Sequence, residues 1–209
     1  MYHWDLPQYL EDEGGWLNRN TAYAFAHYCD LVSQRIGAKV DAFTTLNEPF
    51  CAGYLSYELG VHAPGLTGRK NGRQASHHLL LAHGLAMQVL RKNCPNVDLG
   101  IVINVHPGYA LTDSTEDLEA TKMGTDYLFH WYIDPLLKQS YPAVMDKLTA
   151  EERPDIQEGD MALIAQPLDF LGMNYYTRNV YTMGADVWFE IVTPEPGNLT
   201  EMGWEIVPA

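Results

Sequence analysis

The sequence has few cysteines, and this shortage excludes one class of protein. Its three cysteines, Cys29, Cys51 and Cys94, are odd in number and widely spaced, and no C-x-x-C pair occurs. A disulfide framework is therefore not expected, and a reducing compartment such as the cytoplasm is favoured. Cys51 follows Glu48 by three residues, but we interpret it as an inert packing residue.

Basic residues and long apolar runs are scarce too. Lysine and arginine number 13 against 27 acidic residues, which gives a net charge of −14. Such a charge argues against nucleic acid or an anionic membrane as a partner. No segment approaches the roughly 20 apolar residues that cross a membrane. The charge suits a soluble cytosolic protein or one that handles neutral substrates, without choosing between them. The 11% aromatic content fits sugar binding, although most aromatic residues serve a core.

Strand-like and helix-like segments alternate along the chain. The helix-like segments are 20–36, 72–92 and 115–133, with short helical pieces near 142–149 and 158–165. A glycine-rich loop is expected over 51–71, and the end of the chain predicts a hairpin over 179–193. Apolar strands fall at 2–6, 40–46, 99–105 and 168–173. This order predicts an α/β fold with a parallel sheet and helical crossovers.

The two parallel-sheet architectures differ in where their polar residues lie. The sequence has no glycine-rich phosphate-binding motif, which a doubly wound nucleotide-binding sheet usually shows. Instead, polar side chains occur at the carboxyl end of every strand: His3, Asn47, Glu48, Asn104, Asn174 and Tyr176. In a (β/α)8 barrel these ends meet at one mouth, where the active site lies. We therefore expect a partial TIM barrel with about four of the eight βα units.

The segment Thr45-Leu46-Asn47-Glu48-Pro49 closes an apolar strand. Its Glu48 is expected to be held by the scaffold and partly desolvated while it stays open to a ligand. These are the conditions that make a glutamate a general acid at neutral pH.

Six sequence blocks together resemble glycoside hydrolase family 1, the β-glucosidase family. In chain order they begin at His3 (HWDLPQ), Gly14 (GGWLNR), Thr45 (TLNEP), Ala63 (APG), Asp169 (DFLGMNYYT) and Met202 (MGWE). The resemblance spans essentially all 209 residues and implies strands three to six of a (β/α)8 barrel. It identifies residues 1–209 as a single partial catalytic domain that lacks N-terminal and C-terminal parts.

The resemblance also assigns roles to individual residues. Glu48 matches the acid/base carboxyl of a retaining β-glucosidase, which protonates the leaving oxygen and then deprotonates water. Asn47 matches the residue that binds the sugar 2-hydroxyl, and Tyr176 matches one that orients the nucleophile. The other expected substrate-binding residues are His3, Trp4, Phe50, Asn104 and Asn174.

The chain departs from the family pattern at the nucleophile. The family supplies that carboxylate from a Thr-Glu-Asn-Gly block, and the sequence contains no such block. Three hypotheses remain open: a piece of an active β-glucosidase, a truncated barrel that binds sugar without cleaving it, or a half-barrel that needs a complementing fragment. The substrate is a β-glucoside or oligosaccharide, and no cofactor is expected. His77, His78 and His83 lie in a helical pattern without a carboxylate partner, so no metal site is predicted.

Overall fold

A parallel sheet forms the centre of the molecule. The computed structural model describes residues 1–185, 187–193 and 199–207. Strands β1 (Ala42–Asn47), β2 (Asp98–Val105) and β4 (Phe170–Tyr175) lie side by side in the order β1-β2-β4, and both pairs are parallel. Tyr2 adds a parallel bridge to Leu46 on the other side of β1. The strands follow one another in chain order, as in a barrel.

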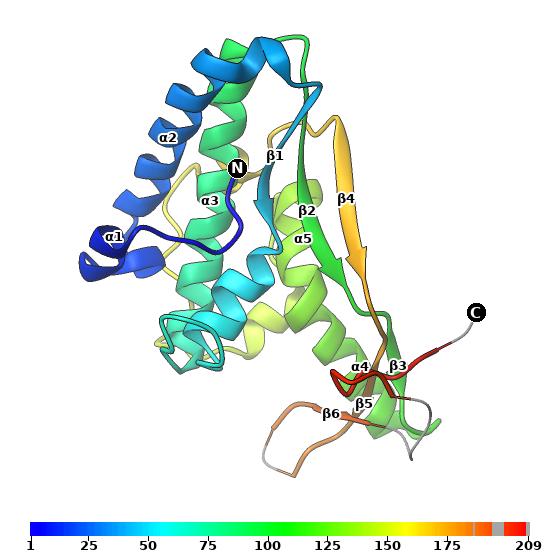
Figure 1. Ribbon diagram of the computed structural model, residues 1–209. Helices are drawn as coiled ribbons and strands as arrows, with labels where there is room; N and C mark the ends of the chain where they lie inside the picture. Colours follow the sequence, from blue (N-terminus) through cyan, green and yellow to red (C-terminus); the bar gives the residue numbers. More distant parts are fainter. Residues whose placement is uncertain (186, 194–198, 208–209) are drawn as a thin grey trace.

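Helices cover one face of this sheet (Figure 1). Helix α3 (Arg69–Asn93) packs on the sheet, and α2 (Asn20–Ile36), α5 (Trp131–Lys138) and α6 (Asp160–Ile164) pack against α3. The short helix α1 (Gln8–Asp12) precedes α2, and α4 (Thr115–Thr125) packs instead against a second, smaller sheet. The described residues do not close the barrel. On the face away from α3, Thr44 and Val102 border an open hollow of about 410 Å³. The expected partial (β/α)8 fold is confirmed, because the strand order and the one-sided helices are those of an incomplete barrel.

Helix α3 lies in the core and is buried on nearly every side. Its apolar side chains pack against α2 and the sheet, and Leu79, Leu80 and Leu81 are all fully buried. Gly84 is needed where α3 meets α6, because a Cβ atom there would lie 2.0 Å from the Leu163 carbonyl oxygen. Helix α3 therefore fixes the positions of α2, α6 and the sheet relative to one another.

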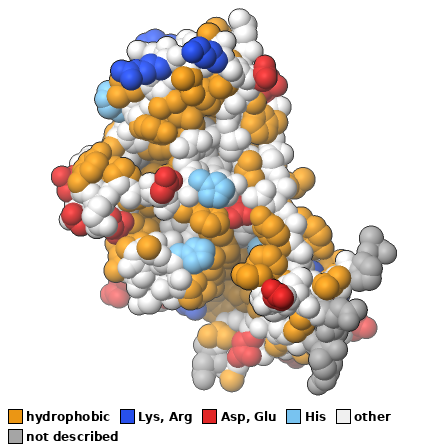
Figure 2. Space-filling view, in the orientation of Figure 1, with side chains coloured by type: hydrophobic (Ala, Val, Ile, Leu, Met, Phe, Trp, Pro, Cys, Tyr) orange, Lys and Arg blue, Asp and Glu red, His pale blue; other side chains and the backbone are white. Residues whose placement is uncertain are grey.

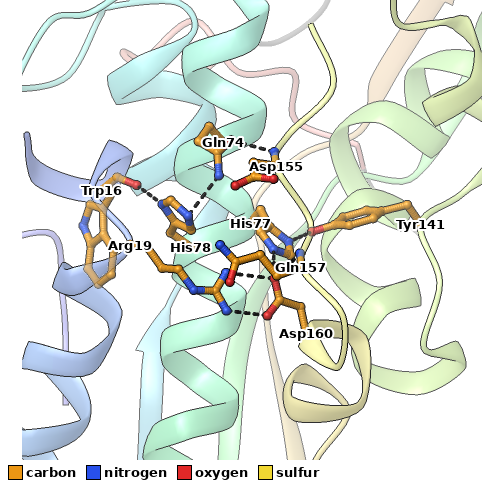
Figure 3. A network of polar contacts seen from close by, with 9 residues as sticks. All are labelled: Trp16, Arg19, Gln74, His77, His78, Tyr141, Asp155, Gln157 and Asp160. Atoms are coloured by element: carbon orange, nitrogen blue, oxygen red, sulfur yellow. Dashed lines mark hydrogen bonds and ion pairs between the residues drawn. The ribbon is translucent and has the colours of Figure 1, made fainter. Parts of the chain in front are cut away.

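A buried polar network ties α3 to its neighbours (Figure 3). Arg19 Nη1 donates to Asp160 Oδ2 at 2.9 Å, and His77 Nε2 lies 2.9 Å from the same oxygen. His77 Nδ1 lies 2.8 Å from the Tyr141 hydroxyl. The adjacent His78 contacts the Trp16 carbonyl oxygen at 2.9 Å. His77 and His78 thus take part in hydrogen bonds that join α3 to α6 and to the turn before α2.

A second, smaller sheet follows the main one in the chain. Strands β3 (Gly108–Ala110), β5 (Asn179–Thr182) and β6 (Glu190–Val192) form it in the order β3-β5-β6. The β5–β6 pair is antiparallel, which confirms the hairpin predicted over 179–193. Strand β3 escapes sequence analysis because three residues are too few to show a periodic pattern.

Two expected elements have other bounds in the structure. The predicted loop over 51–71 is wrong at both ends, since Cys51–Leu55 forms a π-helical turn and α3 already begins at Arg69. The helix predicted over 115–133 continues to Lys138 through a second π-helical turn at Asp126–His130. A proline removes one backbone donor and so predicts a break, but Pro135 lies inside α5 and the helix continues to Lys138.

The strands expected at the two ends of the sheet are shifted or shortened. The strand predicted over 2–6 is reduced to the bridge at Tyr2, because the backbone turns at Trp4, whose φ is +77°. Strand β4 lies at Phe170–Tyr175, two residues later than the predicted 168–173. Asn174 therefore lies within the strand and Tyr176 just beyond it. No helix within the described ranges combines the length and the apolar character needed to span a bilayer.

Candidate active site

Glu48 directly follows β1, and its backbone is fixed on both sides. Its N–H donates to the Val102 carbonyl oxygen of β2 at 2.8 Å, and its carbonyl oxygen accepts from the Cys51 N–H at 2.9 Å. The φ angle of Glu48 is +49°, a left-handed value that non-glycine residues rarely adopt. Residues in such conformations cluster at functional sites, where neighbours hold them in place. Only 4% of Glu48 is exposed.

Two asparagines from different strands lie beside this carboxyl. Asn174 Nδ2 on β4 donates to Glu48 Oε1 at 2.8 Å and to Asn47 Oδ1 at 3.2 Å. Asn104 on β2 is the register partner of Asn174, and it is buried. Three adjacent strands therefore bring amide groups to the face that bears Glu48.

The N-terminal segment adds two rings on the other side of Asn47. Trp4 Nε1 donates to the Asn47 carbonyl oxygen at 2.9 Å, and Asn47 Nδ2 lies 3.4 Å from His3 Nε2. The His3 and Trp4 ring centroids are 4.9 Å apart. Figure 2 shows histidine and acidic side chains in the middle of this face, with hydrophobic side chains around them. Polar groups and flat rings are thus exposed side by side, the combination that a sugar ring requires.

Phe50 and His106 lie close to each other, and His106 is near enough to Glu48 to feel its charge. The Phe50 ring centroid is 6.3 Å from that of His106 and 5.0 Å from that of Tyr54. Burial lowers the pKa of His106, and the negative charge of Glu48 acts in the opposite direction. Sequence analysis missed His106, although the residue directly follows β2 and shares the strand parity of Asn104.

Tyr176 lies apart from these contacts. The residue is half-exposed just beyond β4, and its ring lies 5.3 Å from that of Trp204. The hydrogen bonds among the described residues join Glu48, Asn47, Asn174, His3 and Trp4 into one group, which does not include Tyr176. The resemblance predicts that Tyr176 orients a nucleophilic carboxylate, but the sequence contains no Thr-Glu-Asn-Gly block to supply that carboxylate.

The geometry suits transfer of a proton to or from a bound ligand. The buried carboxyl accepts a hydrogen bond from Asn174, which also bonds Asn47, and Asn47 contacts His3. These amides and this imidazole can bind sugar hydroxyl groups beside a group that transfers a proton. Cys51 also approaches the carboxyl, with Sγ 3.4 Å from Glu48 Oε2. All three cysteines are free and buried. A single carboxyl in this setting can serve as a general acid or a general base.

Comparisons with known proteins point to one family. The model of glycosyl hydrolase family 1 matches residues 1–201. A β-glucosidase from Agrobacterium sp. is 38% identical over 211 residues, which cover 99% of this chain and 46% of that protein. A bifunctional β-D-glucosidase/β-D-fucosidase from Bifidobacterium breve is 36% identical, and the match covers all of this chain and 48% of the relative.

Solved structures show the same relationship in three dimensions. The family 1 β-glucosidase from Thermotoga maritima superposes with a TM-score of 0.93 at 32% identity, over 99% of this chain and 47% of the other. The chain spans about half the length of the curated relatives that it matches. The family model, the identity to these relatives and the shared fold together show that the chain belongs to glycosyl hydrolase family 1.

Proposed function

We propose that this chain supplies the acid/base half of a retaining β-glucosidase, with residues 1–209 as part of one catalytic domain. The observation that supports the proposal most strongly is the hydrogen bond of 2.8 Å between Asn174 and the buried carboxyl of Glu48, at the carboxyl ends of parallel strands. This is where barrel enzymes place their catalytic groups. The curated relatives are named β-glucosidases, which favours a β-glucoside as the substrate.

In this mechanism Glu48 acts twice. It protonates the glycosidic oxygen as the bond to the sugar breaks, and it then deprotonates the water that releases the sugar. Asn47 and His3 bind sugar hydroxyl groups, and Trp4 and Asn174 hold the Asn47 and Glu48 groups in position. The aromatic ring of Phe50 packs beside the leaving group, and Asn104 supports Asn174 from the neighbouring strand. No step requires a cofactor.

The retaining reaction also needs a nucleophilic carboxylate about 5–5.5 Å from the acid/base group. The sequence contains no Thr-Glu-Asn-Gly block, so we assign the nucleophile to a part of the enzyme outside these 209 residues. Tyr176 is the residue that would orient it. The open hollow bordered by Thr44 and Val102 favours this view, because the inner face of the sheet is available to the remaining strands.

The same open face supports two alternatives for the isolated chain: sugar binding without cleavage, or activity only with a complementing half-barrel. Two assays separate these alternatives. The first measures hydrolysis of an aryl β-glucoside by the chain alone, and the second repeats the measurement after addition of a polypeptide that carries the remaining strands. We expect hydrolysis only in the second assay. Hydrolysis by the chain alone would contradict the pure binder and the need for an external nucleophile.

A separate titration tests whether the chain binds a β-glucoside, with Asn47→Ala as the comparison. Isothermal titration of the chain with a non-hydrolysable β-glucoside should give heat of binding that is absent for Asn47→Ala. If neither the chain nor its complemented form binds or hydrolyses any β-glycoside, the proposed function is wrong.

A further inference from the structure

The two oxygens of the Glu48 carboxyl have different partners. Oε1 accepts a hydrogen bond of 2.8 Å from the amide of Asn174. Oε2 faces the thiol of Cys51, whose Sγ lies 3.4 Å away, and Cys51 is 92% shielded from solvent. One oxygen is thus held by a strong donor and the other by a weak one, since a thiol is a weak donor and a weak acceptor.

The local backbone enforces this contact. The Cys51 N–H donates to the Glu48 carbonyl oxygen at 2.9 Å, so both side chains leave the same turn. Burial and the neighbouring charge of Glu48 both raise the pKa of Cys51. The sulfur therefore keeps its proton and can donate it in a hydrogen bond to the carboxylate. This position does more than fill space, in contrast to the interpretation of Cys51 as an inert packing residue.

We propose that Oε2 is the oxygen from which Glu48 gives up its proton, because Asn174 keeps Oε1 as the acceptor and the Cys51 sulfur beside Oε2 accepts too weakly to retain that proton. The inference rests on the acid/base role proposed above for Glu48. The protonated oxygen of a carboxyl group is a poor acceptor, so the oxygen that accepts from Asn174 remains the carbonyl oxygen. The proton then resides on Oε2, beside a sulfur that accepts too weakly to hold it back.

The proton balance of the reaction follows from this arrangement. The proton moves from Oε2 to the glycosidic oxygen, which also takes the electron pair of its bond to C1, while the nucleophilic carboxylate bonds to C1. The thiol then donates to the ionised Oε2. In the second half, water attacks C1, the carboxylate leaves with its electron pair, and Oε2 takes the proton from that water.

Infrared spectroscopy tests the contact without any turnover. The S–H stretching band lies where other protein groups do not absorb, and it moves to lower frequency when the thiol donates a hydrogen bond. The Cys51 band is identified as the one that disappears in Cys51→Ala, or in Cys51→Ser if the alanine variant does not fold. We expect this band to lie at a lower frequency than the S–H band of Cys29. Glu48→Gln should move this band and leave the Cys29 band in place. A Cys51 band at the Cys29 frequency, or one that is insensitive to Glu48→Gln, would overturn the proposal.

Kinetics of the complemented enzyme test whether the weak acceptor beside Oε2 matters for proton transfer. A serine hydroxyl accepts a proton more strongly than sulfur, so Cys51→Ser should slow hydrolysis of methyl β-glucoside several-fold and that of dinitrophenyl β-glucoside much less. Cys51→Ala leaves no side-chain acceptor beside Oε2, so it should not slow methyl β-glucoside more than dinitrophenyl β-glucoside. Equal slowing of both substrates in Cys51→Ser would contradict the proposal. A shifted S–H band in a protein that hydrolyses no glucoside would instead contradict only the proposed function.

Discussion

At the scale of single residues, Glu48 is held mainly by the scaffold and not by an ion pair. Its backbone bonds reach β2 and the turn at Cys51, its Oε1 accepts from an amide, and its φ of +49° is a conformation that only such bonds maintain. Neutral hydrogen-bond donors orient a carboxyl and still allow it to gain and lose a proton. This is what a group that acts as acid and then as base requires.

The acid/base assignment predicts a dependence on the leaving group. In the complemented enzyme, Glu48→Gln should slow cleavage of methyl β-glucoside by about 10²–10⁴-fold, because that leaving oxygen needs a proton. Dinitrophenyl β-glucoside, whose leaving group needs none, should be cleaved at a nearly unchanged rate in the first step. Glu13→Gln, at an exposed position, is the matched control. Equal slowing of both substrates would remove Glu48 from this role.

Residue-scale prediction from the sequence succeeded where a motif fixes the backbone. Asn47 and Glu48 stand side by side at a strand end, so their neighbourhood could be predicted directly. The partner on Oε1 could not be predicted with the same certainty, since Asn174 reaches Glu48 only through the β2–β4 register. His106 was missed because a lone imidazole carries no distinctive pattern. Cys51 was interpreted as an inert packing residue because the sequence does not show which way its thiol points.

At the scale of elements, α3 concentrates buried histidines that must stay neutral. Burial lowers the pKa of His78 to about 4 and that of His83 to about 3. The unfolded values lie near 6.5, so unfolding takes up protons at mildly acidic pH. This part of the stability is fully present above about pH 6.5 and is lost as the pH falls toward 4, by about 1.4 kcal/mol per pH unit for each histidine.

Urea unfolding between pH 7 and pH 5 measures this effect. The free energy of unfolding should fall steeply over this range in the native chain. His78→Gln should flatten the dependence, since it removes one group that takes up a proton on unfolding. His27→Gln is the control because His27 is exposed on α2. A stability that is independent of pH over this range would contradict the buried, neutral state of these histidines.

The ion pair at the start of α6 makes a second prediction at this scale. Asp160 is 1% exposed and binds both Arg19 and His77, so its loss leaves the buried His77 and the partly exposed Arg19 without this acceptor. Asp160→Ala should lower the free energy of unfolding by about 3 kcal/mol, the lower end for buried pairs because Arg19 is partly exposed. Asp146→Ala is the control, since Asp146 meets Arg153 at 3.6 Å on the surface. Equal effects of the two variants in urea denaturation would contradict the role of the network.

Elements were predictable where their patterns are long. Helix α2 has the bounds Asn20–Ile36 that its apolar spacing and Gly37 indicate. Short or irregular pieces such as β3 and the π-helical turn at Cys51–Leu55 were not predicted, because tertiary contacts decide them. The two-residue shift of β4 has the same origin. Its register is set by β2, whose Asn104 pairs with Asn174.

At the scale of the whole molecule, the unclosed sheet has exposed apolar residues at its edge. Met173 and Tyr175 on β4 are 64% and 55% exposed, and among the described strands β4 pairs only with β2. Exposed edges of this kind promote association between copies. Met173→Lys should therefore increase the monomer fraction in sedimentation velocity, whereas Leu118→Lys, at an exposed position on α4, should not. A native chain that is monomeric at high concentration would contradict this expectation.

The central claim is that a sugar binds beside Glu48, and nuclear magnetic resonance of the chain tests it most directly. The side-chain amide signals of Asn47 and Asn174 should shift together when methyl β-D-glucoside is added. The signal of Asn93, which is engaged with Asp30 and Ser33 far along α3, should stay in place. Saturable shifts at Asn47 and Asn174 are the predicted result. Shifts confined to other residues would contradict the account.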